Sequence, residues 1–110
     1  MIIDSQENIT VLTQEKVSLG TFVENFKKAL PKLENQHLIL NLLSLTKVNA
    51  NDLVEFLEYS RVHKAAKKSF VLVANAVDYE KVHMDLSVAP TLREAYDIIE
   101  IEDIERDLEF

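Results

Sequence analysis

The chain has 110 residues, of which 47% are hydrophobic and 28% are charged, and this composition excludes a disordered or collagen-like protein and indicates one globular domain. It has no cysteine, so disulfides and thiolate zinc sites are excluded and a reducing, cytoplasmic location is expected. The net charge of −7 lies mainly in residues 97–110, which hold seven acids and one base, so nucleic acid is not an expected partner.

The first half of the chain alternates between strand and helix patterns. Residues 9–13 are rich in β-branched side chains and predict a strand, and residues 1–3 predict a short edge strand. Apolar residues then follow helical spacing over residues 19–33, with Pro31 expected to end or kink the last turn. Residues 38–45 form a nearly continuous apolar run, which is typical of a strand buried on both faces.

The second half continues this alternation. A helix is predicted over residues 52–68, a strand over 70–74, a short helix over 78–84, and a further helix from Thr91, whose hydroxyl and Glu94 form a capping box. Val88 predicts a brief extended stretch. Alternating strands and helices predict an α/β fold with a mostly parallel sheet of four or five strands, covered by helices. We expect one domain over residues 1–110, no membrane span and no signal peptide.

The helix over residues 52–68 has a predicted inner and outer face. Helical spacing places Leu53, Phe56 and Leu57 inside. The same spacing places Asp52, Glu55 and Tyr59 toward solvent.

Catalytic chemistry is poorly represented. The histidines, His37, His63 and His83, lie far apart in the sequence and lack metal-ligand spacing. Gly20 is the only glycine, so phosphate-binding loops and the nucleophile elbow of α/β-hydrolases are excluded. We therefore expect no catalytic residues, no metal, no cofactor and no enzymatic activity.

Four segments resemble the STAS family, the domains of anti-sigma factor antagonists and of sulfate-transporter tails. They are a central strand, the loop and helix start that follow it, the next strand, and the capped final helix: Leu38–Ser44, Thr46–Leu53, Phe70–Asn75 and Pro90–Ala95. The resemblance implies a single STAS-like α/β domain that acts as a bacterial, cytoplasmic regulatory module.

The resemblance also implies that a phosphorylation switch has been lost. The family typically carries Asp-Ser-Ser-Gly-Leu in the loop, and here Ala50, Asn51 and Asp52 align with the two serines and the glycine. Asn51 has no hydroxyl to accept phosphate, and Asp52 would repel a phosphate beside it. The switch is then absent, unless Ser44 or Thr46 replaces the missing acceptor.

The expected function is protein–protein interaction through the loop and helix start, with contact residues Asn49, Asn51, Asp52 and Glu55. The alternative for the two asparagines is simple helix capping. The partner implied is a protein, such as an anti-sigma factor, a kinase-like protein or an enzyme. Two other functions stay open: binding of a nucleotide or lipid, or service as an accessory protein of an enzyme such as ribonuclease Z. The ribonuclease Z activity itself is not expected, because its His-x-His-x-Asp-His metal motif is absent.

Residues 100–110 predict an acidic helical extension that makes contacts. Ile101, Ile104 and Leu108 form a stripe at i, i+3 and i+7, separated from the preceding stripe by a break in phase after Ile99 that predicts a kink or a second short helix. The stripe either packs on its own domain or reaches a partner with a basic face or a second copy, as in a homodimer. One basic cluster could supply that face, in cis or across a dimer: Arg61, Lys64, Lys67 and Lys68.

Overall fold

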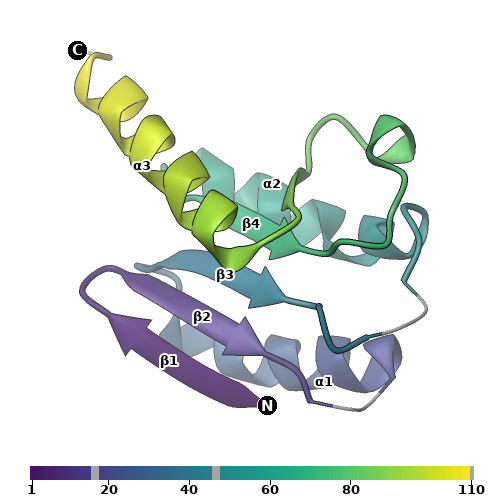
Figure 1. Ribbon diagram of the computed structural model, residues 1–110. Coiled ribbons are helices and arrows are strands. Elements are labelled where there is room, and N and C mark those ends of the chain that lie inside the picture. Colours follow the sequence, from purple (N-terminus) through teal and green to yellow (C-terminus); the bar gives the residue numbers. More distant parts are fainter. Residues whose placement is uncertain (16–17, 46–47, 110) are drawn as a thin grey trace.

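The computed structural model describes residues 1–15, 18–45 and 48–109, and it is built around a five-stranded sheet with the order β1-β2-β3-β4-β5 (Figure 1). The strands are β1 (Ile2–Gln6), β2 (Ile9–Thr13), β3 (His37–Asn41), β4 (Phe70–Val73) and β5 (Ser87–Ala89). The helices are α1 (Leu19–Ala29), α2 (Leu57–Ala65) and α3 (Leu92–Asp107). Three 3-10 turns complete the set: η1 (Leu30–Lys32), η2 (Asp52–Phe56) and η3 (Tyr79–Lys81).

The predicted mixed α/β architecture is confirmed, with differences in detail. Strands β2 to β5 are parallel, and β1 runs antiparallel to β2 at the edge. The extended stretch at Val88 is a fifth strand, because it hydrogen-bonds alongside β4. The predicted helix over residues 78–84 is only η3, and the predicted helix over residues 52–68 begins as η2 and becomes regular only in α2.

Helices α1 and α2 cover one face of the sheet with an aromatic core. Phe22, Phe26, Phe56 and Phe70 are fully buried, and the ring centroid of Phe26 lies 6.0 Å from Phe56 and 5.9 Å from Phe70. Tyr59 packs edge-on against Phe26 at 5.2 Å, so its predicted solvent-facing position is wrong. An amphipathic tyrosine can bury its ring and keep its hydroxyl near water, which helical spacing does not reveal.

The inner face of the second helix is otherwise close to prediction. Leu53 and Phe56 have no exposed surface, whereas Leu57 is half-buried rather than buried. Glu55 is exposed and Asp52 is half-buried. The change from 3-10 to α geometry between η2 and α2 alters the angular spacing of these side chains, which accounts for the shift at Leu57.

Helix α3 covers the opposite face. Ala95 and Ile99 pack on Ile39, Val71 and Val73, the side chains that the parallel strands direct to this face. The Thr91 hydroxyl oxygen accepts the Glu94 N–H at 3.1 Å, as the capping box predicts. The helix then continues without interruption to Asp107, so the predicted kink after Ile99 is wrong.

A polar network fixes the second half of α3 to the sheet. His37 lies at the start of β3, and its Nε2 is 3.2 Å from a carboxylate oxygen of Asp103. The Ser69 N–H donates to His37 Nδ1 at 2.9 Å, and the Ser69 hydroxyl donates to Glu102 at 2.6 Å. Arg106 donates to Asp103 at 2.9 Å and to the Ser69 hydroxyl oxygen at 2.8 Å. These contacts place residues 102–106 on the sheet.

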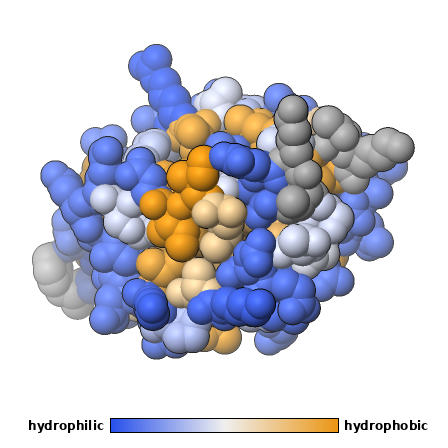
Figure 2. All heavy atoms as spheres, turned by 90° about the horizontal axis from the view of Figure 1, so that it is seen from below, coloured by the Kyte–Doolittle hydropathy of each residue, from blue (hydrophilic) through white to orange (hydrophobic). Residues whose placement is uncertain are grey.

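The edge strand β1 is the most exposed part of the sheet. All five of its residues are exposed, and Ile2 and Ile3 are each about half exposed. On the face seen from below, hydrophobic residues gather near the middle and hydrophilic residues surround them (Figure 2). Within the described ranges, every helix falls short of the length and apolar character needed to cross a membrane.

Candidate partner-binding site

The loops that leave the carboxyl ends of β2, β3 and β4 meet at one end of the sheet, where open α/β sheets commonly bind their ligands. The β3–η2 loop is anchored by Val48 and Ala50, whose side chains are buried. Between and beside these anchors, Asn49 and Asn51 are exposed. The loop therefore presents alternate residues to the outside.

Asn49 is a capping residue. Its side-chain oxygen accepts the Asp52 N–H at 2.9 Å, and the Asp52 carboxylate accepts the Asn49 N–H at 3.0 Å. This reciprocal pair satisfies two backbone donors at the start of η2, as a capping box does. The capping interpretation is therefore correct for Asn49. Asp52 also stabilises the start of η2, and its half-buried side chain remains partly exposed to solvent.

Asn51 is different from Asn49. Its side chain is exposed and makes no hydrogen bond to any described residue. Capping thus does not account for Asn51. The adjacent Ala50, which aligns with the first of the two serines typical of the STAS loop, is only 7% exposed. Its side chain therefore does not face outward.

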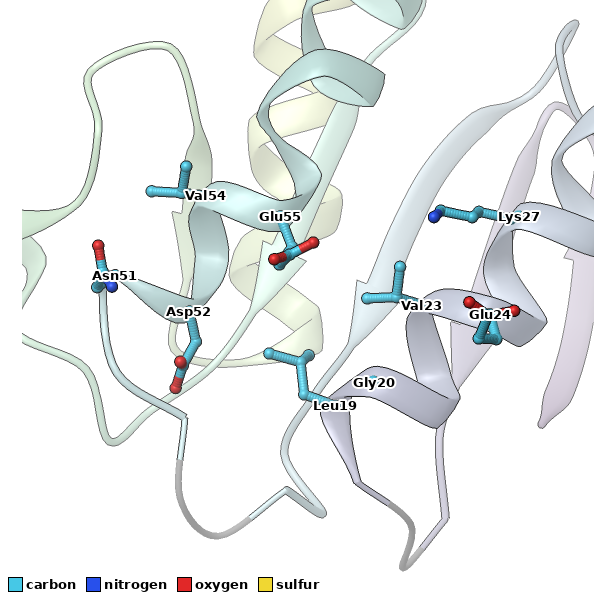
Figure 3. Close-up of a pocket in the computed structure, with 9 residues that line it drawn as sticks. All are labelled: Leu19, Gly20, Val23, Glu24, Lys27, Asn51, Asp52, Val54 and Glu55. Carbon is cyan, nitrogen blue, oxygen red and sulfur yellow. The ribbon is translucent and has the colours of Figure 1, made fainter.

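The first cavity beside Asn51 has a volume of about 490 Å³ and lies between the start of α1 and η2 (Figure 3). Its lining is Leu19, Gly20, Val23, Glu24, Lys27, Asn51, Asp52, Val54 and Glu55. Leu19 and Val23 project from α1 toward η2 and form an apolar floor (Figure 3). Three carboxylates face a single lysine in this lining, so the cavity favours a cationic group.

The second cavity lies on the other side of Asn51, toward the segment between β4 and β5, and has a volume of about 710 Å³. Its lining is Asn49, Ala50, Asn51, Val54, Ala76, Asp78, Lys81 and His83. Asp78 and Lys81 are 4.0 Å apart as an ion pair. Asn51 and Val54 line both cavities, and Val54 is 46% exposed.

We call the exposed surface of Asn49, Asn51, Asp52, Val54 and Glu55 the loop surface. The structure brings together all four site residues predicted near the start of the second helix. Val54 lies within the predicted loop and helix start, residues 48–57, but the sequence does not single it out, and it does not indicate the contributions of α1 and the β4–β5 segment. The rule that carboxyl ends of parallel strands share one edge would have identified both neighbouring segments.

Of the two alternative phosphate acceptors, Ser44 and Thr46, only Ser44 lies within the described residues. The Ser44 hydroxyl donates to the main-chain carbonyl of Gln14, which ties the loop after β3 to the loop after β2. Thr46 lies outside the described residues.

The predicted basic cluster is only partly available. Arg61 donates to Asp85 at 3.1 and 3.0 Å and to Glu58 at 3.3 Å. Lys64 donates to the Asp85 carbonyl at 2.8 Å and to Ser87 at 3.1 Å, and burial lowers the pKa of its amine against the opposing effect of nearby carboxylates. Both side chains thus tie α2 to Asp85 and Ser87, so part of the charge of the predicted basic cluster is already paired within the domain.

His37, Ser69 and Asp103 have residue types found in hydrolytic triads, but their geometry is different. The Ser69 hydroxyl donates to Glu102, and His37 Nδ1 accepts the Ser69 main-chain N–H instead. The imidazole therefore accepts a hydrogen bond from a main-chain N–H and is not placed to activate the Ser69 hydroxyl as a nucleophile. In the part of the chain that the structure describes, no group of three or more His, Asp or Glu side chains is placed to hold a metal ion.

The fold is similar to that of a solved structure of a serine-to-glutamate variant of RsbS from Moorella thermoacetica. The two share a TM-score of 0.66 at 18% sequence identity, over 96% of this chain and 97% of that chain. RsbS is a STAS domain anti-sigma factor antagonist, so the fold expected from the resemblance is confirmed. No family model and no curated protein matches the sequence.

Proposed function

We propose that this chain is a non-enzymatic regulatory module, similar to anti-sigma factor antagonists, that binds a protein partner through the loop surface. The observation that carries the proposal is the position of Asn51 and Val54. Both residues are exposed and lie between two cavities. They also lie at the end of the sheet where the loops after β2, β3 and β4 meet. Interfaces of this kind commonly have an exposed apolar residue surrounded by polar groups.

The charge of the site favours a protein partner with a basic contact patch. Glu24, Asp52 and Glu55 line the first cavity against Lys27 alone. A nucleotide would bring its phosphates toward these carboxylates, so the electrostatics oppose nucleotide binding in the first cavity. A partner enzyme that presents lysine or arginine would suit the same surface, which keeps the accessory-protein alternative within this proposal.

We expect no phosphorylation at the start of the second helix. Asn51 offers an amide where the resemblance places the acceptor, and Asp52 and Glu55 would repel an added phosphate. Intact-mass measurement after incubation with an anti-sigma-type kinase and ATP should show the unmodified chain, while a known substrate in the same reaction becomes phosphorylated. A stoichiometric phosphate mapped to Ser44 or Thr46 would refute both the alignment and the loss of the switch.

Charge reversal at Glu55 should greatly weaken binding of the partner without unfolding the domain. Glu55 is exposed and lines the first cavity, and none of the interactions between described residues involves its carboxylate. Glu55→Lys should therefore leave the melting temperature nearly unchanged, since most surface substitutions alter stability by less than about 0.5 kcal/mol. Asp52→Lys is a poorer probe, because losing its capping bond costs about 1 kcal/mol.

The test is quantitative co-purification from native lysate with wild type, Glu55→Lys and Glu7→Lys. Glu7 is an exposed acid in the β1–β2 turn, at the opposite end of β2 from the loop surface, and its reversal makes the same change in net charge. We expect one protein to be recovered by wild type and Glu7→Lys and to be depleted at least tenfold with Glu55→Lys. Equal recovery by all three chains would contradict the proposal.

A further inference from the structure

Helix α3 carries an apolar stripe that faces away from its own domain. Ile101, Ile104 and Leu108 are 56%, 55% and 75% exposed. At about 100° per residue they share one side of the helix, roughly opposite Ile99 and Ala95, which are buried against the sheet. The expectation that the stripe packs on its own domain is therefore wrong.

The network around His37 explains why the stripe stays exposed. Glu102, Asp103 and Arg106 project toward the sheet and bond to Ser69 and His37. These bonds fix the rotation of the helix about its axis. The hydrophobic side chains at the intervening positions must then point outward, and the C-terminal end of α3 extends away from the body of the molecule (Figure 1).

The borders of the stripe are acidic on both sides. Glu100 and Asp107 lie along one border, and Glu105 lies along the other. Arg106 is the only base in residues 97–110, and it is turned into the network with Ser69 and Asp103. The surface seen by a partner is thus a hydrophobic line with carboxylates on both sides.

We propose that this stripe, Ile101, Ile104 and Leu108, is a second docking site, and that its occupant is an amphipathic basic helix of a partner protein. An i, i+3, i+7 pattern of exposed apolar side chains matches the apolar face of another helix. Lysine and arginine beside that face would pair with the flanking carboxylates, which steer association and select against other partners.

A second copy of this chain fits the stripe less well. Two α3 helices placed face to face would bring two acidic borders together, and residues 97–110 hold seven acids against one base in each chain. On the basic side of α2, Arg61 and Lys64 already bond to Asp85 and Ser87, which reduces the positive charge that this side could offer to a second copy.

The probe is a synthetic helical peptide with leucines at i, i+3 and i+7 and lysine or arginine at the flanking positions. Its binding to the full chain is measured by fluorescence anisotropy at low and high salt, beside a scrambled peptide of the same composition. The test variant is Ile101→Asn/Ile104→Asn, and the control is Val62→Asn, which replaces an exposed apolar residue of α2.

We expect the patterned peptide to bind wild type and Val62→Asn equally, and the double variant at least tenfold more weakly. High salt should weaken binding, and the scrambled peptide should not compete. The melting temperature of the double variant should stay close to wild type, because both substituted side chains are more than half exposed.

Three results would overturn the proposal. They are equal binding by the double variant, equal binding of the scrambled peptide, or sedimentation of wild type as a dimer that the double variant abolishes, which would assign the stripe to a second copy. Glu55→Lys serves as a further control, since it should not alter peptide binding. Failure of the loop surface as a partner site would therefore leave this result unaffected.

Discussion

Replacing Phe26 with alanine should lower the free energy of unfolding by about 3–5 kcal/mol. Phe26 has no exposed surface, and its ring contacts those of Phe56, Tyr59 and Phe70 at centroid distances of 6.0, 5.2 and 5.9 Å. It therefore joins α1 to η2, α2 and β4 at once. A domain of ordinary stability has only about 5–15 kcal/mol in total, so this single change would remove a large part of it.

Urea unfolding at neutral pH measures the effect of Phe26→Ala. The matched control is Val62→Ala, a truncation of an apolar side chain that is 69% exposed, which should change the free energy of unfolding by less than about 0.5 kcal/mol. A loss below about 1 kcal/mol for Phe26→Ala would show that α1 does not pack on α2 and β4 through this side chain.

Replacing His37 with alanine should destabilise the chain and reduce the pH dependence of its stability. Removing the imidazole leaves the buried Ser69 N–H without an acceptor, which costs about 1–3 kcal/mol before any loss of packing. The substitution also releases Asp103 from its contact with His37 Nε2. The second half of α3 should therefore exchange its amide hydrogens faster than in wild type.

The direction of the pH effect follows from the lowered pKa of His37. Burial lowers this pKa, the Asp103 carboxylate opposes the shift, and the positive charges of Arg106 and Lys68 reinforce it. The unfolded chain, with a histidine pKa of about 6.5, then binds more protons than the folded chain between that value and the lowered one. Stability is therefore complete above about pH 6.5 and falls as the pH drops, by at most about 1.4 kcal/mol per pH unit for each such histidine.

Unfolding free energies measured between about pH 7.5 and 5.5 test this effect. Burial also lowers the pKa of His63, so the slope of His37→Ala should be smaller than that of wild type but not zero. Ile99→Ala is the control, because it destabilises the same α3 layer without removing a titratable group. Equal slopes for wild type and His37→Ala would contradict the role of His37.

Patterns of hydrophobicity are sufficient to predict a mostly parallel sheet covered by helices. The uninterrupted apolar run of β3 predicted a strand buried on both faces, and all three residues of its centre, Leu38–Leu40, have no exposed surface. The fifth strand was harder to predict, since β5 has only three residues and depends on pairing with β4. The break in phase after Ile99 predicts a kink, but in the structure it marks a change from residues that face the sheet to residues that face solvent.

The functional features that the sequence could not supply depend on distant residues. Ser69 lies more than thirty positions after His37, and Arg106 lies more than thirty positions after Ser69. Only the fold brings these three residues into one network. Asn49 and Asn51 look equivalent as capping residues in the sequence. Hydrogen-bond geometry alone distinguishes Asn49, which caps η2, from Asn51, which faces outward between two cavities.

Hydrogen–deuterium exchange of the chain with the co-purified partner tests most directly whether the loop surface binds that partner. The proposal predicts slower exchange on complex formation in residues 48–57 and at the start of α1, with the β1–β2 turn unchanged. Protection confined to another face, or a complex in which residues 48–57 exchange as fast as in the free chain, would contradict it.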